Sequence, residues 1–320
     1  MVRGAVVIAV LLACRSGEAP EPAPKVDPPV APALNPPATV EGRLEAAIRS
    51  GMLREQADAV ELIARVRIPK TAPLLYLALD ASENVRVLAA HALVDMRLHD
   101  ALPKLREVLG KSNKARDLEL EVAMALYRLG DKGADVLAIV NSGTLPNHTM
   151  WRLEAALALA DGGDELARAP LADIAAKTPK DADQYWRAVG GLAKLGDQPA
   201  LRLLEVELGK RQLSRVLRAA KLLAHAGAKK GLDRLAAFLA EKDFETPEEA
   251  ALALADEGDR RALTWVHDGL ASPSAEDRLK AVSIATWFVA TDYKGSIARL
   301  AASDPDERVR ATAELALIAF

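Results

Sequence analysis

Cysteine, aromatic side chains and an excess of charge of either sign are all scarce in this sequence. Its 320 residues include one cysteine, Cys14, and only four each of tryptophan, tyrosine and phenylalanine. A single cysteine excludes an internal disulfide and a thiolate cage for a metal. The 42 basic and 45 acidic residues nearly cancel, to a formal charge of −3. Because no basic excess is available to neutralise phosphates, we expect no nucleic-acid partner.

The apolar run at the N-terminus is short. It covers Gly4 to Ala13, follows Arg3 and ends in Leu11-Leu12-Ala13-Cys14. A helix of that length rises about 15 Å, half of a bilayer core, so the run is too short to span a membrane. A basic residue before a short apolar run is typical of a secretory signal peptide.

The end of this run resembles the lipobox of bacterial lipoproteins. The resemblance implies that residues 1–13 are a signal peptide and that Cys14 is the first mature residue and carries acyl chains, which together anchor a protein stably in a membrane. No Asp follows Cys14, so the usual enterobacterial rule places the protein in the outer membrane, facing the periplasm. If the signal-peptide interpretation is wrong, the chain is cytoplasmic.

Residues 14–41 are predicted to be a proline-rich linker. Eight prolines fall between Glu18 and Val40, and proline stops both helix and sheet from propagating. Such a segment favours polyproline II and spans up to roughly 75 Å over some 25 residues, at about 3.1 Å per residue. We interpret it as a spacer or as disordered filler between the membrane and the folded part.

Residues 42–320 repeat one pattern, in which an Ala/Leu-rich run ends in Gly-Asp and another run follows. The glycines stand at Gly130, Gly163, Gly196 and Gly258. An anchoring residue recurs every 30 to 33 residues, at Val60, Leu93, Leu126, Leu159, Leu192, Leu223 and Leu254, near Trp287, and at Leu317. This period, with two helices in each copy, predicts an α-solenoid of stacked helical hairpins with no sheet.

The repeat resembles the short HEAT repeat of the type named after phycobilin lyases. That pattern runs Val-Arg, Ala-Ala-x-Ala-Leu, Leu-Gly-Asp and then a second amphipathic helix, and Val85 to Leu93 fits it closely. The resemblance implies about eight and a half repeats. The glycines are expected to end each first helix in a left-handed turn. The following Asp caps the second helix, while Asn84 and Asp306 cap first helices. The final half repeat is expected to cap the eighth, with Leu315, Ile318 or Phe320 laid on it.

Residues for chemistry are few. None of the five histidines belongs to a His-Glu-x-x-His motif or to the adjacent His-Glu pairs of HEAT-type di-iron hydroxylases. Phosphate-binding loops and Gly-x-Ser-x-Gly motifs are missing from the sequence as well. The paired carboxylates recur with the repeat, which favours capping over acid–base work. We therefore predict no catalytic residues, no metal site and no cofactor.

Two candidate binding surfaces remain. We expect second helices to line a long concave surface, with Lys104, Arg202, Glu205, Arg234 and His267 on it. The irregular connection from Asn141 to Met150 is the other. It contains His148 and is followed by Trp151 and, one repeat later, by Tyr185 and Trp186. These aromatics are either exposed binding anchors or rings that plug the irregular loop.

The favoured function is a membrane-tethered, non-enzymatic scaffold of the cell envelope that binds a protein or peptide partner. A structural subunit of an envelope assembly is the first alternative. An enzyme of the lyase kind, or an enzyme subunit, is the second, and a clustered, buried, titratable group would favour it.

Overall fold

The computed structural model describes residues 39–111, 116–146, 151–241 and 244–320. In these residues it contains α-helices and short 3-10 turns and no β-strand. The prediction of an all-α solenoid is confirmed. The predicted signal peptide, Cys14 and the linker up to residue 38 lie outside the described residues.

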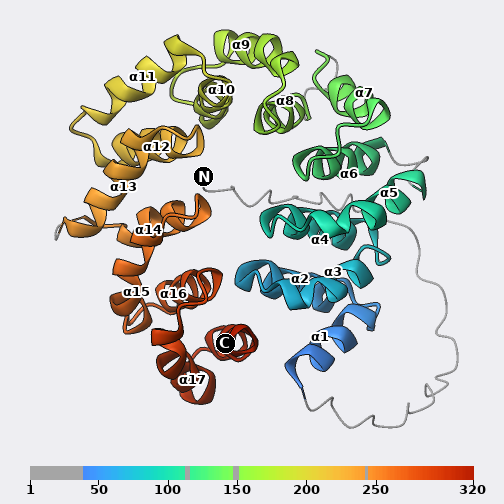
Figure 1. Ribbon diagram of the computed structural model, residues 1–320, viewed down its shortest axis with the longest axis vertical. Coiled ribbons are helices and arrows are strands. Elements are labelled where there is room, and N and C mark those ends of the chain that lie inside the picture. The colour runs from blue at the N-terminus through green and yellow to red at the C-terminus, as the bar shows by residue number, and fades with distance from the viewer. Residues whose placement is uncertain (1–38, 112–115, 147–150, 242–243) are drawn as a thin grey trace, which may run out of the picture.

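The helices form two layers that follow a circuit, with the even-numbered helices inside and the odd-numbered helices outside (Figure 1). The inner helices are α2 (Leu53–Val66), α4 (Glu83–Asp95), α6 (Arg116–Arg128), α8 (Arg152–Asp161), α10 (Asp183–Lys194), α12 (Leu213–His225), α14 (Pro247–Asp256), α16 (Ala275–Trp287) and α18 (Glu307–Ala316).

The outer helices are α1 (Val40–Arg49), α3 (Ala72–Ala78), α5 (Leu102–Lys111), α7 (Ala134–Gly143), α9 (Arg168–Lys177), α11 (Gln198–Leu208), α13 (Lys229–Ala240), α15 (Leu263–Leu270) and α17 (Lys294–Ser303). Short 3-10 turns precede α3, α5, α9, α15 and α17, at Pro69–Thr71, His99–Ala101, Glu165–Ala167, Arg260–Ala262 and Thr291–Tyr293, and a last one ends the chain at Leu317–Ala319.

Glycine ends most of the inner helices, as predicted. Gly130, Gly163, Gly196, Gly227 and Gly258 have φ between 73° and 97°, a region that glycine enters without steric cost. The next residue then donates its N–H to the carbonyl of the anchoring leucine, as in the 3.0 Å bond from Asp131 to Leu126. Asp197 caps the outer helix α11 and accepts from the Ala200 N–H at 2.9 Å. Asp164 and Asp259 cap the 3-10 turns before α9 and α15, whereas Asp131 does not cap α7.

Two details of the predicted repeat are wrong. Asn84 lies inside α4, whose N-cap residue is Ser82, whereas Asp306 does cap α18. In the eighth copy the residue equivalent to the anchoring leucines is Ala285, because the Ala290 N–H donates to its carbonyl at 2.9 Å. Trp287 lies two residues further on, and its indole N–H donates to the carbonyl of Arg65 in α2 at 2.9 Å.

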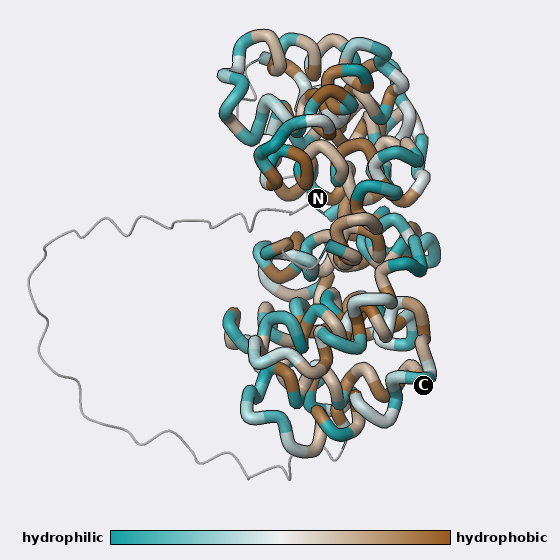
Figure 2. The backbone as a smooth tube through the Cα atoms, turned by 90° about the vertical axis from the view of Figure 1, so that its left-hand side faces the viewer, coloured by the Kyte–Doolittle hydropathy of each residue, from teal (hydrophilic) through white to brown (hydrophobic). Residues whose placement is uncertain are grey.

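Small residues explain why the even-numbered helices form the inner layer. Helices α8 and α14 share the run Ala-Ala-Leu-Ala-Leu-Ala-Asp. In α10, a Cβ added at Gly190 would come within 2.6 Å of Leu222 in α12. Short side chains let consecutive inner helices approach closely, so each hairpin is narrower inside than outside and the stack bends inward. The expectation that second helices line the concave side is therefore wrong. Viewed at 90° to Figure 1, apolar segments run through the interior of the molecule and hydrophilic segments lie mostly at its edges (Figure 2).

The solenoid closes on itself. Helix α18 packs on α16 and α17 and, from its other side, on α2 and α1 (Figure 1). Helix α1 takes the place of an outer partner for α18, so the two ends of the folded chain together complete a ninth hairpin. Arg43 of α1 pairs with Glu314 of α18 at 2.6 Å. We call the contact of α1 and α2 with α16 and α18 the seam. The predicted half repeat thus joins the two ends, and Leu315 is buried there.

Among the described residues, three other than glycine occupy the left-handed position, and all three lie near the seam. They are Arg67, Arg97 and Val289, with φ of 54°, 52° and 47°. Arg67 pairs with Asp256 of α14 at 2.9 Å, and its guanidinium lies 3.7 Å from the centre of the Trp287 ring. Arg97 donates to the Asp256 carbonyl at 3.4 Å.

Candidate functional site: a groove on the outer layer

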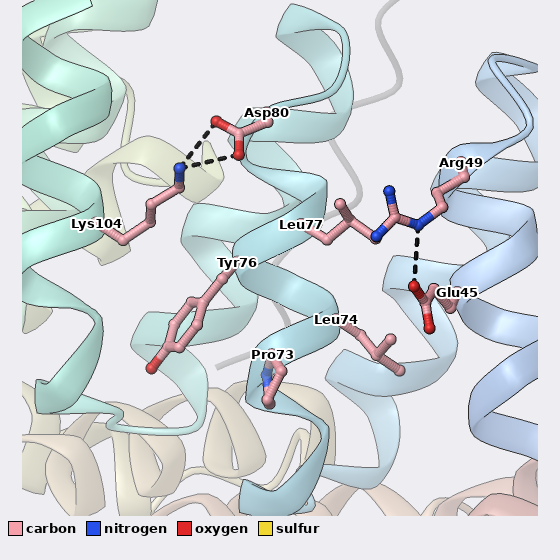
Figure 3. A pocket seen from close by; sticks show the side chains of 8 residues that line it. All are labelled: Glu45, Arg49, Pro73, Leu74, Tyr76, Leu77, Asp80 and Lys104. Atoms are coloured by element: carbon pink, nitrogen blue, oxygen red, sulfur yellow. Dashed lines mark hydrogen bonds and ion pairs between the residues drawn. The ribbon is translucent and has the colours of Figure 1, made fainter.

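A groove of about 500 Å³ opens on the outer layer beside the seam. Side chains from α1, from α3 with the turn after it, and from α5 line it (Figure 3). The lining residues are Glu45, Arg49, Pro73, Leu74, Tyr76, Leu77, Asp80 and Lys104.

The sequence of α3 accounts for the apolar floor of the groove. The helix reads Ala-Pro-Leu-Leu-Tyr-Leu-Ala, so it is apolar all round. Its Pro73 stands in the first turn, where the missing amide costs little. One face, with Leu75 fully buried, packs into the core. The opposite side leaves Leu74, Tyr76 and Leu77 partly exposed in the groove.

Two ion pairs flank this floor. On one side the Arg49 Nε bonds the Glu45 Oε1 at 2.9 Å. On the other side the Lys104 ammonium donates to both oxygens of Asp80, at 2.9 and 3.0 Å, and to Glu107 at 3.2 Å (Figure 3). The hydrogen bond to Asp80, followed by that to Glu107, raises the pKa of Lys104 although burial opposes it. Each of the two cations already holds a carboxylate.

Tyr76 supplies a free donor at the edge of the floor. Burial, followed by the negative charge of Asp100, raises the pKa of its phenol, so the hydroxyl keeps its proton. The hydroxyl has no hydrogen-bond partner among the described residues. A tyrosine with an apolar body and an unpaired polar tip suits a contact with an incoming chain.

Of the residues predicted to line the concave surface, only Lys104 lies in the groove. Arg202 and Glu205 lie on α11, Arg234 on α13 and His267 on α15, all in the outer layer. Glu205 pairs with Lys230 of α13 at 2.9 Å, and Arg234 pairs with Glu241 and covers the ring of Phe238. This part of the prediction is wrong because the second helices are the outer ones. The structure does not gather these side chains into one site.

The aromatic candidates are mostly packing residues. Tyr185 and Trp186 are 8% and 5% exposed and meet edge to face at 5.1 Å. The Arg218 guanidinium lies 4.6 Å from the centre of the Trp186 ring. Trp151 precedes α8 half-buried, and its indole N–H donates to Asp117 at 2.9 Å. Tyr185 and Trp186 are therefore buried, so the expectation that they are exposed binding anchors is wrong. His148 lies outside the described residues, as does Cys14.

Sequence reasoning missed the groove, although a signal was present. A seven-residue helix that is apolar on every side cannot bury all of its surface in a two-layer stack. Among the described residues, no three side chains of His, Cys, Asp or Glu gather where a metal could bind, and none of the helices is long and apolar enough to cross a bilayer.

No family model and no curated protein matches the chain. Among solved structures, human deoxyhypusine hydroxylase in complex with glycerol is 19% identical, with a TM-score of 0.32, over 88% of this chain and 96% of that one. An engineered protein has the same identity and TM-score over 88% of both chains. At TM-scores this low the likenesses carry no argument, and the solenoid rests on the helices and contacts described above.

Proposed function

We propose that the protein is a non-enzymatic scaffold that binds an extended segment of another protein in the groove between α1, α3 and α5. The groove carries the proposal because it combines an apolar floor with an ion pair on each side. Its volume of about 500 Å³ falls in the range of about 300–1,000 Å³ that ligand sites occupy. The stacked hairpins present this surface on the outer layer.

The chemistry of the groove suggests what the partner carries. Leu74 and Leu77 offer apolar contact to side chains of the peptide. Carboxylates of the peptide would exchange with Glu45 and Asp80 for Arg49 and Lys104, and a carbonyl would accept from the Tyr76 hydroxyl. Tyrosine and arginine are the residues that most often dominate binding at protein interfaces. We propose an apolar segment with acidic residues near both ends.

The sequence supports the tether. Acyl chains on Cys14 would anchor the protein in the envelope membrane, facing the periplasm, and the proline-rich segment would hold the solenoid up to roughly 75 Å from it. The groove lies next to α1, where this segment joins the folded part, so the tether and the binding surface share one end of the molecule.

Photo-crosslinking in intact cells tests this proposal. A photoreactive residue at Tyr76 should capture a defined partner, whereas one at Ala302, exposed on α17, should not. The paired variant Leu74→Asp with Lys104→Glu should reduce the product at least about tenfold, as expected for a loss of about 1.4 kcal/mol or more. Cys14→Ser should release the protein from the membrane fraction.

Equal capture from both positions, or capture that the paired variant leaves unchanged, would contradict the groove. A stable complex that survives extraction with fixed stoichiometry would instead indicate a structural subunit of an envelope assembly. Retention of the Cys14→Ser variant in the membrane fraction would contradict the lipid anchor alone.

A further inference from the structure

The carboxyl ends of several inner helices converge on one histidine, His225, at the last position of α12. Its Nε2 lies 3.0 Å from the Asp161 Oδ1 at the end of α8, and its Nδ1 lies 3.1 Å from the Glu257 Oε1 after α14. Lys194, at the end of α10, donates to the His225 carbonyl at 2.6 Å. Arg128 of α6 donates to the other oxygen of Asp161 at 3.1 Å. We call His225, Asp161 and Glu257 the clasp.

The clasp connects repeats that are not neighbours. Along the inner layer α10 lies between α8 and α12, so the bond from His225 to Asp161 passes over one complete repeat. The bond to Glu257 continues to the next inner helix. Most other ion pairs of the described residues join neighbouring repeats, such as Arg187 with Glu154 at 2.7 Å, or lie within one repeat, such as Lys229 with Asp233. The clasp therefore constrains the curvature of the ring and not only the contact between two hairpins.

Both bonds can form together only when the imidazole is doubly protonated. An ionised carboxylate accepts hydrogen bonds and donates none, and a neutral imidazole carries a single N–H. With one proton removed, one ring nitrogen would present its lone pair to a carboxylate oxygen about 3 Å away. Neutral His225 can therefore hold Asp161 or Glu257, but not both.

The surroundings keep the two carboxyl groups ionised. Burial raises the pKa of Asp161, but its hydrogen bond with His225 and the charge of Arg128 outweigh burial and bring it to about 2. Burial also opposes ionisation of Glu257, and the bond to His225 still lowers its pKa. For His225 burial favours the neutral form, yet the hydrogen bonds to Asp161 and Glu257 outweigh it and raise the pKa.

Other charged groups lie near the clasp. Arg128 and Lys194 are the cations on α6 and α10. Asp256, beside Glu257 on α14, pairs with Arg67 of α2. Lys229, at the start of α13, pairs with Asp233. Lys132 lies over the Tyr127 ring, and its charge acts on Asp161, while the charge of Lys194 acts on Glu257. Among the described residues, however, none of these cations hydrogen-bonds both clasp carboxylates, as the imidazolium does.

We propose that the clasp is a proton-dependent device that sets the curvature of the ring. With His225 protonated, the ends of α8, α12 and α14 are held together. Loss of the proton frees one carboxylate and loosens this side of the inner layer. The device is independent of the groove, which lies on α1, α3 and α5.

The direction of the effect follows from linkage. A histidine whose pKa is raised on folding adds stability that is fully present below its unfolded pKa of about 6.5. That stability is lost as the pH rises through the folded pKa. The ring is therefore tightest in mild acid and loosens toward alkaline pH.

Spin labels and a histidine titration on the full chain test the device. In a Cys14→Ser background, Leu166→Cys after α8 and Arg260→Cys after α14 place labels on exposed residues. The distance between the labels should be shorter and more narrowly distributed at about pH 5.5 than at about pH 8.5, on either side of the histidine titration. By NMR, His225 should titrate above the ordinary histidine value. His225→Gln should remove the pH dependence of the distance.

Matched variants keep the test decisive. His91 makes one bond, to Glu121 at 2.9 Å, so His91→Gln should leave the pH dependence of the label distance unchanged. Glu257→Gln keeps the imidazole but removes one charged partner, and should lower the pH at which His225 titrates. His225→Arg should keep the short distance at both pH values. Titration of His225 at or below the ordinary value, or the same pH-dependent distance in His225→Gln, would overturn the proposal.

Discussion

Inner helices in the regular part of the ring and near the seam end in the same left-handed turn, but different residue types occupy it. From α6 to α14 each inner helix ends in a left-handed glycine, whereas Arg67, Arg97 and Val289 occupy this position in the copies that meet at or beside the seam. A left-handed conformation costs an ordinary residue roughly 1–2 kcal/mol. The regular part avoids this cost because its neighbours along the chain are copies of the same hairpin and require no further contact there.

At the seam the side chain at this position makes contacts that glycine cannot. Arg67 reaches Asp256 and covers Trp287, so α2 is joined to both α14 and α16. A partly exposed ion pair contributes about 0–1 kcal/mol and a cation over an aromatic ring about 0.5–1 kcal/mol or more, which together offset the backbone strain. The buried Arg67 Nε has no partner among the described residues, so part of this gain is lost. Nothing in the structure explains Val289, which is 52% exposed.

The largest loss of stability is expected from a deletion that removes the seam. Deleting residues 307–320 removes α18 and uncovers the inner surface that it packs on. Val309 and Leu315 are fully buried, and burial of such a side chain contributes about 1.5–3 kcal/mol, so these two alone imply a loss of about 3–6 kcal/mol. The free energy of unfolding should fall by at least this amount. Small-angle scattering should show a longer maximum dimension as the ring opens.

A charge variant separates the apolar and ionic parts of the seam. Arg43 and Glu314 are each nearly half exposed, and pairs of this kind contribute about 0–1 kcal/mol. Arg43→Glu should therefore change stability little and leave the scattering curve unchanged. An unaltered maximum dimension in the deletion variant would show that α18 does not close the ring.

A smaller difference is expected between two arginine–aspartate pairs. Near the seam, Arg278 and Asp304 are 8% and 5% exposed and share two bonds of 2.8 and 2.9 Å. Asp304→Asn leaves a buried guanidinium without its counter-charge, at a cost of about 3–5 kcal/mol. In the regular part Arg152 pairs with Asp173 at 2.7 Å, but Asp173 is one-third exposed and also pairs with Lys177. Asp173→Asn should therefore cost at most about 1 kcal/mol.

Thermal unfolding at several pH values checks the contribution of the Arg278–Asp304 pair to stability. The hydrogen bond with Arg278 lowers the pKa of Asp304. Its contribution to stability is therefore present above the unfolded value of about 3.9 and is lost as the pH falls through the folded pKa. Equal losses for the two variants near neutral pH would contradict the assignment of burial as the cause.

The repeat was predictable because its strongest signals are local. A left-handed turn favours glycine and a helix start favours a cap, so Gly163 and Asp197 mark their positions in the sequence whatever lies around them. The sequence also contained the signal for the inner layer, because its Ala-rich first helices can pack closely together. The concave surface was nevertheless assigned to the second helices, which form the outer layer. The anchor near Trp287 was misplaced because its equivalent, Ala285, is small.

Closure could not be read from the sequence. It results from a small rotation between hairpins that accumulates over the whole array, and no single residue specifies that rotation. Contacts such as Arg43 with Glu314 join residues 271 positions apart and have no local signature. The clasp was equally hidden, because His225 lies in an ordinary first helix and gains its two carboxylates only when the inner layer curves.

The smallest expected effects test the left-handed position itself. A Cβ added at Gly163, where φ is 73°, would meet nothing within 4 Å, so Gly163→Ala measures the backbone alone and should cost about 1 kcal/mol. Val289→Gly removes that strain and adds about 0.5–1 kcal/mol of unfolded-chain entropy, for a net gain of about 0.5–1 kcal/mol. Arg67→Gly should lose stability despite the same relief, because its contacts are lost. Urea midpoints at constant slope measure all three. If Val289→Gly is destabilising while Gly163→Ala is neutral, backbone conformation does not select the glycines, and the contrast between seam and regular repeats needs another cause.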